Sequence, residues 1–271
     1  MPIITISRGS YSKGKEVAEK VAKKLGYECI ARDVIIDASK EFNIPEIKLV
    51  RAIHDAPSIL ERVGYSKEKY LAYLRVALLE HFQEDNVIYH GLAGHFFIKG
   101  IYHVLKVRII ADMDERVKLE MERESISGKE ASRILKNDDR ERRKWGKYVY
   151  GIDTWDPSLY DLVIHIKKIT VDDAADIVCH TVGLERFKTT AESQEMLNHL
   201  LTAARVKAAL MDLKPDAEVF AQNGTVSITG RATEFQKDKL IHQIEEIAKT
   251  IPGVSNVEVH FSEPYQFVDP E

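Results

Sequence analysis

Hydrophobic and polar positions in the first two thirds of the chain follow two alternating periods. Short apolar runs, typical of buried strands, are separated by longer segments with apolar residues three or four positions apart, typical of amphipathic helices. The apolar runs are Ile3–Ser7, Tyr27–Ala31, Asn86–His90, Val104–Ala111 and Leu162–Ile166. The helical segments are Lys13–Leu25, a mainly helical stretch up to about residue 84, Asp114–Glu124, Gly128–Tyr148 and Val171–Val182. This order predicts an α/β fold with a mostly parallel sheet and helices on both faces.

The pattern changes near residue 183, where a polar segment predicts a linker. Asn223-Gly224, a strong hairpin signal, joins two of the short strands that follow. The predicted elements are a helix at Leu197–Leu213, strands at Glu218–Ala221 and Thr225–Thr229, a helix at Glu234–Thr250 and a strand at Val254–Phe261. We therefore expect a second, small α+β unit of order αββαβ. The expected division is 1–183 for the first domain, 184–195 for the linker, 196–263 for the second domain and 264–271 for a tail.

Composition narrows the class of protein. Hydrophobic residues make up 44% of the 271 positions, enough for packed cores. The net charge of −4 gives no overall electrostatic case for a nucleic-acid partner. Two distant cysteines, Cys29 and Cys179, fit a reducing compartment better than a disulfide framework. We find no apolar run of about 18 residues and no signal-peptide pattern, so we expect a cytoplasmic protein without a transmembrane segment.

The most informative motif directly follows the first apolar run. Residues 9–16 read G-S-Y-S-K-G-K-E, the G-x-x-x-x-G-K spacing of a phosphate-binding loop between a strand and a helix. In such a loop, backbone N–H groups and the helix N-terminus converge on a phosphate, while the lysine reaches its oxygens as a mobile charge. An ordinary strand-to-helix turn with a solvated Lys15 is the alternative. The residues expected to bind phosphate are Gly9, Ser10, Lys13, Gly14, Lys15 and Glu16.

Glu16 stands where such loops usually carry the Ser or Thr that ligates Mg²⁺. A carboxylate can ligate the ion directly or through water, but it also brings negative charge toward the phosphates. We expect ATP and Mg²⁺ as ligands, with Glu16 as the candidate metal ligand or with the ion held mainly by nucleotide and water. Structural roles are favoured over a metal cluster for His54, His90 and His95, because no paired carboxylate motif accompanies them.

Further motifs follow in order within residues 1–183. They are Ala31–Ile35 (A-R-D-V-I), Val87–Leu92 (V-I-Y-H-G-L), Arg108–Asp112 with Glu115–Val117, Asn137–Lys144 (N-D-D-R-E-R-R-K), and Asp156–Ser158 with Tyr160–Leu162. Together with the loop, this ordered set resembles the cytidylate-kinase-like branch of the nucleoside monophosphate kinases. The resemblance implies a P-loop NTPase-type sheet, a helical insertion that accepts the monophosphate, and an arginine-rich helical lid. It also implies ATP-dependent phosphorylation of a CMP- or dCMP-like acceptor.

The resemblance assigns roles to residues by their position. Lys15 would contact ATP phosphates and act in catalysis, and Asp33, with Arg32 and Gly91, would lie at the acceptor site. The lid and the helix that leads to it would supply Arg116, Arg123, Asp139, Arg140, Arg142 and Arg143, with Arg140 and Arg143 catalytic. Such arginines suit a reaction that spreads negative charge over phosphoryl oxygens. On composition alone, the same segment also fits a solvated helix with i,i+4 charge pairs such as Asp138 and Arg142.

Several positions depart from the family pattern. Leu92 and Asn137 stand where typical members carry arginine, Lys144 replaces the last lid arginine, and Glu16 replaces the hydroxyl residue. Candidates to compensate for the missing charge are Arg32, Arg75 and His95. The departures leave two alternatives open. One is a weakly active or inactive nucleotide sensor whose output is the C-terminal unit, and the other is a kinase with a different small acceptor.

The C-terminal unit carries two motifs of its own. Asn223–Gly230 reads N-G-x-V-x-I-x-G, and Ile251–Val257 reads I-P-G-V-x-x-V. Over residues 196–262 the unit resembles a BON domain. That resemblance implies binding or association rather than catalysis, and we expect a regulatory or oligomerising module, with homo-oligomer formation or small-ligand binding as its function.

Overall fold

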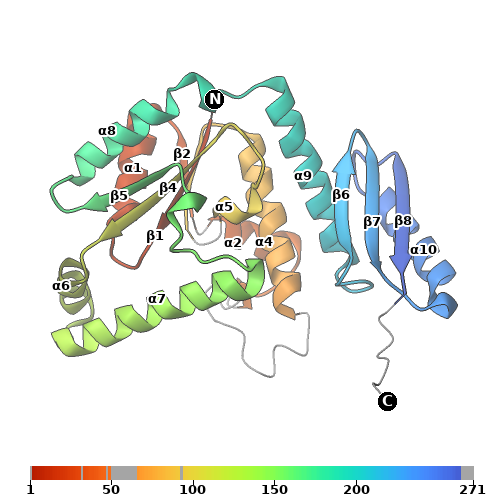
Figure 1. Cartoon of the computed structure of the whole chain (residues 1–271), viewed down its shortest axis with the longest axis horizontal. Helices are drawn as coiled ribbons and strands as arrows, with labels where there is room; N and C mark the ends of the chain where they lie inside the picture. Colours follow the sequence, from red (N-terminus) through yellow and green to blue (C-terminus); the bar gives the residue numbers. More distant parts are fainter. Residues whose placement is uncertain (1, 32, 47, 50–65, 92–93, 264–271) are drawn as a thin grey trace, which may run out of the picture.

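The computed structural model describes residues 2–31, 33–46, 48–49, 66–91 and 94–263 (Figure 1). Its first part contains a five-stranded sheet of order β2-β3-β1-β4-β5, in which all four neighbouring pairs are parallel. The strands are β1 (Ile3–Arg8), β2 (Glu28–Ile30), β3 (Val87–His90), β4 (Val104–Ala111) and β5 (Leu162–Ile166). The predicted parallel α/β sheet is therefore confirmed. Because β1 is the central strand, its carboxyl end lies in the middle of one edge of the sheet.

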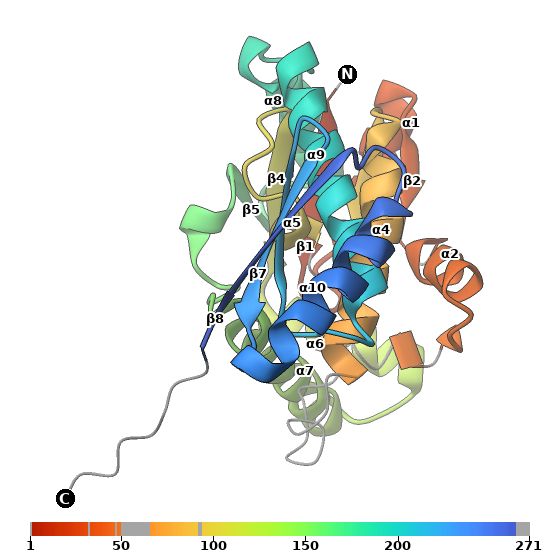
Figure 2. The same cartoon turned by 90° about the vertical axis from the view of Figure 1, so that its right-hand side faces the viewer.

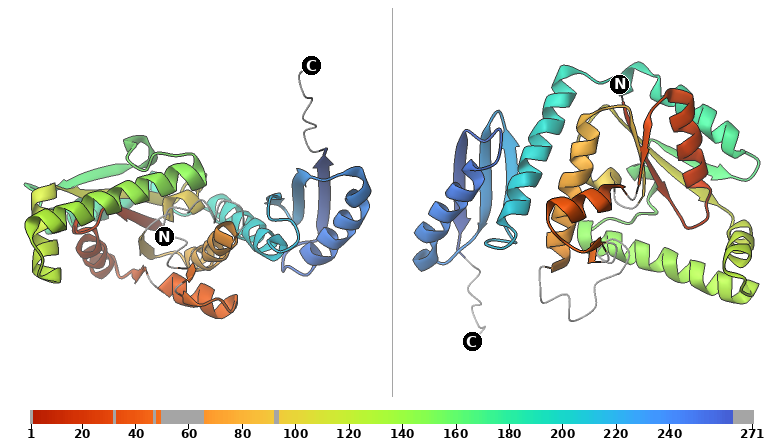
Figure 3. Two further views of the ribbon diagram at one scale, coloured as in Figure 1. Left: turned by 90° about the horizontal axis from the view of Figure 1, so that it is seen from below. Right: turned by 180° about the vertical axis from the view of Figure 1, so that it is seen from behind.

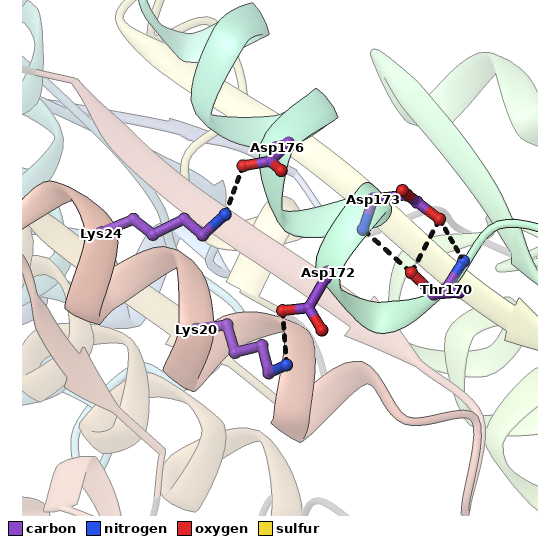
Figure 4. A network of polar contacts seen from close by, with 6 residues as sticks. All are labelled: Lys20, Lys24, Thr170, Asp172, Asp173 and Asp176. Carbon is purple, nitrogen blue, oxygen red and sulfur yellow. Dashed lines mark hydrogen bonds and ion pairs between the residues drawn. The ribbon is translucent and has the colours of Figure 1, made fainter.

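Two helices cover one face of the sheet, α1 (Gly14–Leu25) and α8 (Val171–Val182). Their small and β-branched residues pack against the apolar side chains of β1 and β4 that point to this face. Figure 4 shows two ion pairs that join the helices, Lys20 with Asp172 and Lys24 with Asp176. The two lysines are four residues apart on α1, and the two aspartates are four residues apart on α8. Both pairs lie at the surface, so they align the helices while the buried apolar contacts supply most of the stability.

The other face of the sheet is covered by α4 (Ser66–Gln83) and the short α5 (Gly94–Phe97), with α2 (Asp33–Glu41) packed against α4. The core on this side contains the fully buried Trp145 and Phe82. Trp145 belongs to α7 (Gly128–Tyr150), which follows α6 (Met113–Glu124). In Figure 1, α6 and α7 lie below the sheet, beyond the carboxyl end of β4. Charged helices thus lie beside the edge at which the loop after β1 emerges.

The C-terminal part folds in the predicted helix–strand–strand–helix–strand order. Its elements are α9 (Ala191–Leu210), β6 (Glu218–Gln222), β7 (Thr225–Arg231), α10 (Glu234–Lys249) and β8 (Asn256–Ser262). The turn between β6 and β7 contains Asn223 and Gly224, with φ of 49° and 78°, and such positive φ values favour the Asn-Gly pair. Figure 2 shows α10 and the strands of this unit from their outer side.

Helix α9 belongs to both parts of the molecule. It begins at Ala191, earlier than the predicted Leu197, because Thr190 and Ser193 form a capping box with backbone contacts of 3.0 and 3.1 Å. One side of α9 packs against α4 through Leu197, Leu201, Ala204 and Ala208, and the other contributes Ala203, Val206 and Leu210 to the core of the C-terminal sheet. In Figure 3, α9 accordingly lies between the two sheets. The C-terminal unit therefore rests on a helix that also completes the core of the first part.

Among the helices in the described ranges, none combines the length and the apolar character that crossing a membrane requires.

We predict that Leu201→Ala lowers the free energy of unfolding by about 2–5 kcal/mol, because it leaves a cavity between α9 and α4. Leu201 is 1% exposed. Urea unfolding followed by circular dichroism measures the change. Glu195→Ala on the same helix is the control, since its side chain is 61% exposed and surface substitutions usually change stability by no more than about 0.5 kcal/mol. Equal midpoints for the two variants would contradict the shared role of α9.

Candidate phosphate-binding site

The loop between β1 and α1 has the backbone conformation of an anion-binding turn. Tyr11 and Lys13 adopt left-handed φ angles of 56° and 62°, although neither is glycine. The carbonyl of Gly9 accepts hydrogen bonds from the backbone N–H and the hydroxyl of Ser12, at 3.4 and 3.0 Å. Where left-handed residues alternate with right-handed ones, successive N–H groups turn toward one point, which suits an anion. The N-terminus of α1, which also favours an anion, follows directly after Lys13. The loop can therefore hold a phosphate through its backbone.

Gly14, the first residue of α1, is required by the close approach of Arg8. A Cβ atom at Gly14 would lie 2.6 Å from Cβ and 2.8 Å from Cδ of Arg8. The next residue, Lys15, has a side chain that is 63% exposed, with its Nζ 3.6 Å from Glu19. A loose surface pair of this kind leaves the Lys15 ammonium free to turn toward a phosphate.

The loop forms one wall of a cavity of about 690 Å³, a volume in the range of small-molecule sites. Helices α6 and α7 form the facing wall. Predicted site residues that line the cavity are Ser10, Lys13, Gly14, Lys15, Glu16, Arg123 and Arg142. The structure thus brings the predicted loop together with two of the predicted lid arginines.

Arg116 joins this loop to the two helices. Its Nε donates to the carbonyl of Ser10 at 2.7 Å, and its two terminal nitrogens each lie 2.8 Å from an oxygen of Asp139. The Arg116 and Asp139 side chains are only 9% and 15% exposed. A buried bidentate pair has a fixed geometry, so Arg116 and Asp139 position the loop rather than stand free to bind a ligand.

Other side chains of α6 and α7 reach the loop directly. The Ser10 hydroxyl donates to Asp138 at 3.3 Å, and Arg142 donates to the carbonyl of Arg8 at 3.2 Å. Arg123 donates to the Tyr11 hydroxyl, and its guanidinium lies 5.5 Å from the centroid of that ring. Polar contacts therefore hold the charged helices against the loop.

Two predicted catalytic residues lie away from this cavity. Arg140 donates to Asn137 at 2.5 Å and has a side chain that is 63% exposed. Arg143 binds Asp153 at 2.8 and 2.9 Å, and this pairing lowers the pKa of Asp153 to about 2. Neither arginine lines the cavity. Their catalytic role stays a prediction that requires both side chains to leave their present partners.

Two of the predicted acceptor residues, Asp33 and Gly91, lie at the ends of β2 and β3. Asp33 begins α2, and its carboxylate accepts from the backbone N–H of Ala31 at 3.3 Å. Gly91 follows β3 and donates its N–H to the carbonyl of Ile6 at 3.3 Å. A Cβ at Gly91 would lie 2.5 Å from the Tyr89 hydroxyl, so packing alone explains this glycine. Arg32, Leu92 and His54 lie outside the described residues.

Two of the three histidines that the sequence singles out, His90 and His95, lie in the described ranges, and both are buried. His95 is 8% exposed and packs against the rings of Phe96 and Tyr160, with centroids 4.0 and 4.9 Å away. Burial lowers the pKa of His95 to about 3, and burial together with the nearby Arg8 charge lowers the pKa of His90 to about 4. No group of three or more His, Cys, Asp and Glu residues suited to a metal ion occurs within the described part of the chain.

A magnesium ion fits the oxygen donors that this cavity offers. Glu16, Asp138 and Ser10 all line it. Carboxylate and hydroxyl oxygens suit a hard cation that keeps several waters and phosphate oxygens as ligands. These residues could therefore complete the shell of an ion that arrives with a nucleotide.

Sequence reasoning missed Arg8, Tyr11 and Asp138 as site residues, although all three line the cavity. Arg8 ends the strand immediately before Gly9, and Asp138 precedes the predicted Asp139. The sequence signal for Arg8 was a charged residue at the carboxyl end of a buried strand, directly before a glycine-containing loop.

We predict that Arg116→Met lowers the free energy of unfolding by about 3–5 kcal/mol, because Asp139 would remain buried without its partner. Urea unfolding measures this loss. Arg133→Met is the matched control, since Arg133 also pairs with a carboxylate but its side chain is 72% exposed. We expect the control to keep the midpoint of the wild type. A similar small effect of both substitutions would contradict the anchoring role of Arg116.

We predict a weaker acid sensitivity for His95→Phe. His95 stays neutral in the folded protein down to about pH 3, whereas the unfolded chain binds a proton near its ordinary pKa of about 6.5. Stability therefore falls as pH falls through this window. Removing the group should reduce the slope of unfolding free energy against pH by up to about 1.4 kcal/mol per unit between pH 5.5 and 3.5. Unfolding curves at several pH values test this, and an unchanged slope would argue against a neutral, buried His95.

Comparison with known proteins gives the family of the chain. Residues 3–168 match the cytidylate kinase-like family. The cytidylate kinase of Sulfolobus acidocaldarius is 29% identical over 182 residues, which cover 66% of this chain and 93% of that protein. The cytidylate kinase of Archaeoglobus fulgidus is 29% identical over 193 residues, covering 68% and 97%. An uncharacterized protein from Eubacterium ventriosum shares the fold, with a TM-score of 0.51, 21% identity and coverage of 67% and 98%. The chain belongs to the cytidylate kinase-like family.

Proposed function

We propose that the protein transfers the γ-phosphoryl group of ATP to a nucleoside monophosphate, with CMP or dCMP as the acceptor. The observation that carries this proposal is the single cavity in which the phosphate loop faces the guanidiniums of Arg123 and Arg142. Membership of the cytidylate kinase-like family and the archaeal cytidylate kinase relatives support the same reaction.

The loop would hold the donor nucleotide. Its N–H groups and the N-terminus of α1 would bind the β-phosphate, and Lys15 would swing to the β- and γ-phosphates. An oxygen of the acceptor's phosphate forms a bond to the γ-phosphorus. The bond from that phosphorus to the β,γ-bridging oxygen breaks, and ADP departs with the bonding electrons. Positioning and charge stabilisation are what such a reaction chiefly needs from the protein.

Magnesium would bind with the nucleotide and neutralise part of its phosphate charge. Glu16 and Asp138 are the carboxylates of the cavity that would complete its shell, with the Ser10 hydroxyl nearby.

Helices α6 and α7 would act as the lid. In this arrangement Arg142 already faces the loop. Arg140 and Arg143 would reach the phosphoryl group when the lid closes. They would then exchange their present partners, Asn137 and Asp153, for phosphate oxygens. Closure would also exclude water that competes with the acceptor. The acceptor would bind on the side of β3 and β2, next to Asp33 and Gly91, and the family resemblance also assigns Arg32 to it.

The C-terminal unit, which resembles a BON domain, would bind a small ligand or a second copy of the chain and would regulate the first part. Its attachment through α9 supports this role, because α9 also packs on α4, and α4 contacts α2 at the start of the proposed acceptor region. A change in the position of α2 could therefore be passed to α9 by direct packing.

We predict that Lys15→Ala lowers kcat/KM for ADP formation on the order of 10²–10³-fold, the usual effect of removing a contact that stabilises transition-state charge. A coupled assay with Mg·ATP and each nucleoside monophosphate measures the rate. Lys23→Ala, an exposed lysine in the last turn of the same helix, is the matched control and should keep the wild-type rate.

The same assay, together with calorimetry of nucleotide binding, separates the proposal from its alternative. If the protein binds nucleotide but shows no Lys15-dependent turnover, it is a nucleotide sensor and not a kinase. The absence of any nucleotide binding would remove both functions.

A further inference from the structure

Arg8 and Arg142 bring two guanidinium groups to the same cavity. Arg8 is the last residue of β1, and Arg142 extends from α7 to donate to the Arg8 carbonyl at 3.2 Å. Both side chains line the cavity. Burial, and then the charge of Arg142, lower the pKa of Arg8. Arg8 reaches the cavity from the end of β1 and Arg142 reaches it from α7.

Arg8 differs from the other arginines of this region in its partners. Arg116 pairs with Asp139, Arg143 with Asp153, and Arg123 with Glu124. For Arg8, the described residues provide no carboxylate partner, and its Nε is buried without a hydrogen-bond acceptor. Like charges that are withdrawn from water raise the free energy unless an anion lies between them. The charges of Asp138 and Asp139 act on Arg142, whereas Arg8 has no such partner in the described residues, so an anion in the cavity would offset the charge of Arg8.

The fold keeps Arg8 in this place. Its aliphatic chain lies against the Cα of Gly14, where a Cβ would come within 2.6 Å of Arg8. The phosphate loop and the Arg8 side chain thus need the same glycine. Its charge also acts on His90 at the end of β3, whose pKa it helps to lower. Arg8 therefore lies between the donor loop and the strand that borders the proposed acceptor side.

We propose that Arg8 binds the phosphoryl group in transfer, the γ-phosphate of ATP, together with Arg142. This inference rests on the proposed function and adds a residue that contacts the reacting group. The two guanidiniums would bind different oxygens of the phosphoryl group and share the charge that develops on them. Charge-assisted bonds of this kind are about twice as strong as neutral ones.

Calorimetry with Mg·AMP-PNP and Mg·ADP tests the proposal on the full chain. Because ADP lacks the γ-phosphate, Arg8→Gln should weaken binding of AMP-PNP by about 10- to 100-fold and binding of ADP by less than about 3-fold. Arg8→Lys, which keeps the charge, should recover part of the affinity. Arg133→Gln, on the exposed side of α7, is the control and should bind both nucleotides as the wild type does.

Thermal unfolding separates ligand binding from a structural role. Neutralising Arg8 removes like-charge repulsion, so Arg8→Gln without nucleotide should melt no lower than the wild type, while the stabilisation by AMP-PNP should shrink. A lower melting temperature without nucleotide, or an unchanged affinity for AMP-PNP, would overturn the proposal. If CMP binding falls instead, Arg8 belongs to the acceptor phosphate. If the wild type binds no nucleotide at all, the proposed function itself fails.

Discussion

The arrangement of the candidate site depends on the buried guanidinium of Arg116. This one side chain binds the backbone of the phosphate loop at Ser10 and the carboxylate of Asp139 on α7. The loop emerges from the central strand β1, so its root is fixed by the sheet, and Arg116 fixes its middle. Because α6 carries Arg116 and α7 carries Asp139, this bidentate pair links the loop to both charged helices, and the contacts of Arg123, Asp138 and Arg142 with the loop add to it.

Charge pairing around that anchor divides the arginines into two groups. Arg116 and Arg143 are bound by aspartates, and Arg140 by an asparagine side chain. Arg8 and Arg142 instead face the cavity beside the loop. A phosphoryl group that enters the cavity would meet Arg8 and Arg142 first. Arg140 and Arg143 could bind it only after their present contacts break. Closure of the lid would then be coupled to the charge of the bound nucleotide.

The strand and helix pattern was sufficient to predict the parallel sheet, since β4, β5 and α8 begin and end at the predicted residues. It placed the start of α9 too late, because the first turns of that helix are polar and its cap is a Thr190–Ser193 box. For the site, the loop motif predicted Lys15 and Gly14, which line the cavity, but it could not point to Arg8. The position of the Arg8 side chain depends on its packing against Gly14. It also depends on Arg142 of α7, a helix more than a hundred residues away in the sequence.

Phosphorus NMR can follow the proposed transfer of a phosphoryl group to a nucleoside monophosphate. The wild-type protein would be incubated with Mg·ATP and with CMP, UMP or GMP, and the products would be followed in the spectrum over time. If the protein is such a kinase, ADP appears together with the β-phosphate signal of a second nucleoside diphosphate, in equal amounts. An unchanged spectrum, or ADP accompanied only by inorganic phosphate, would contradict it.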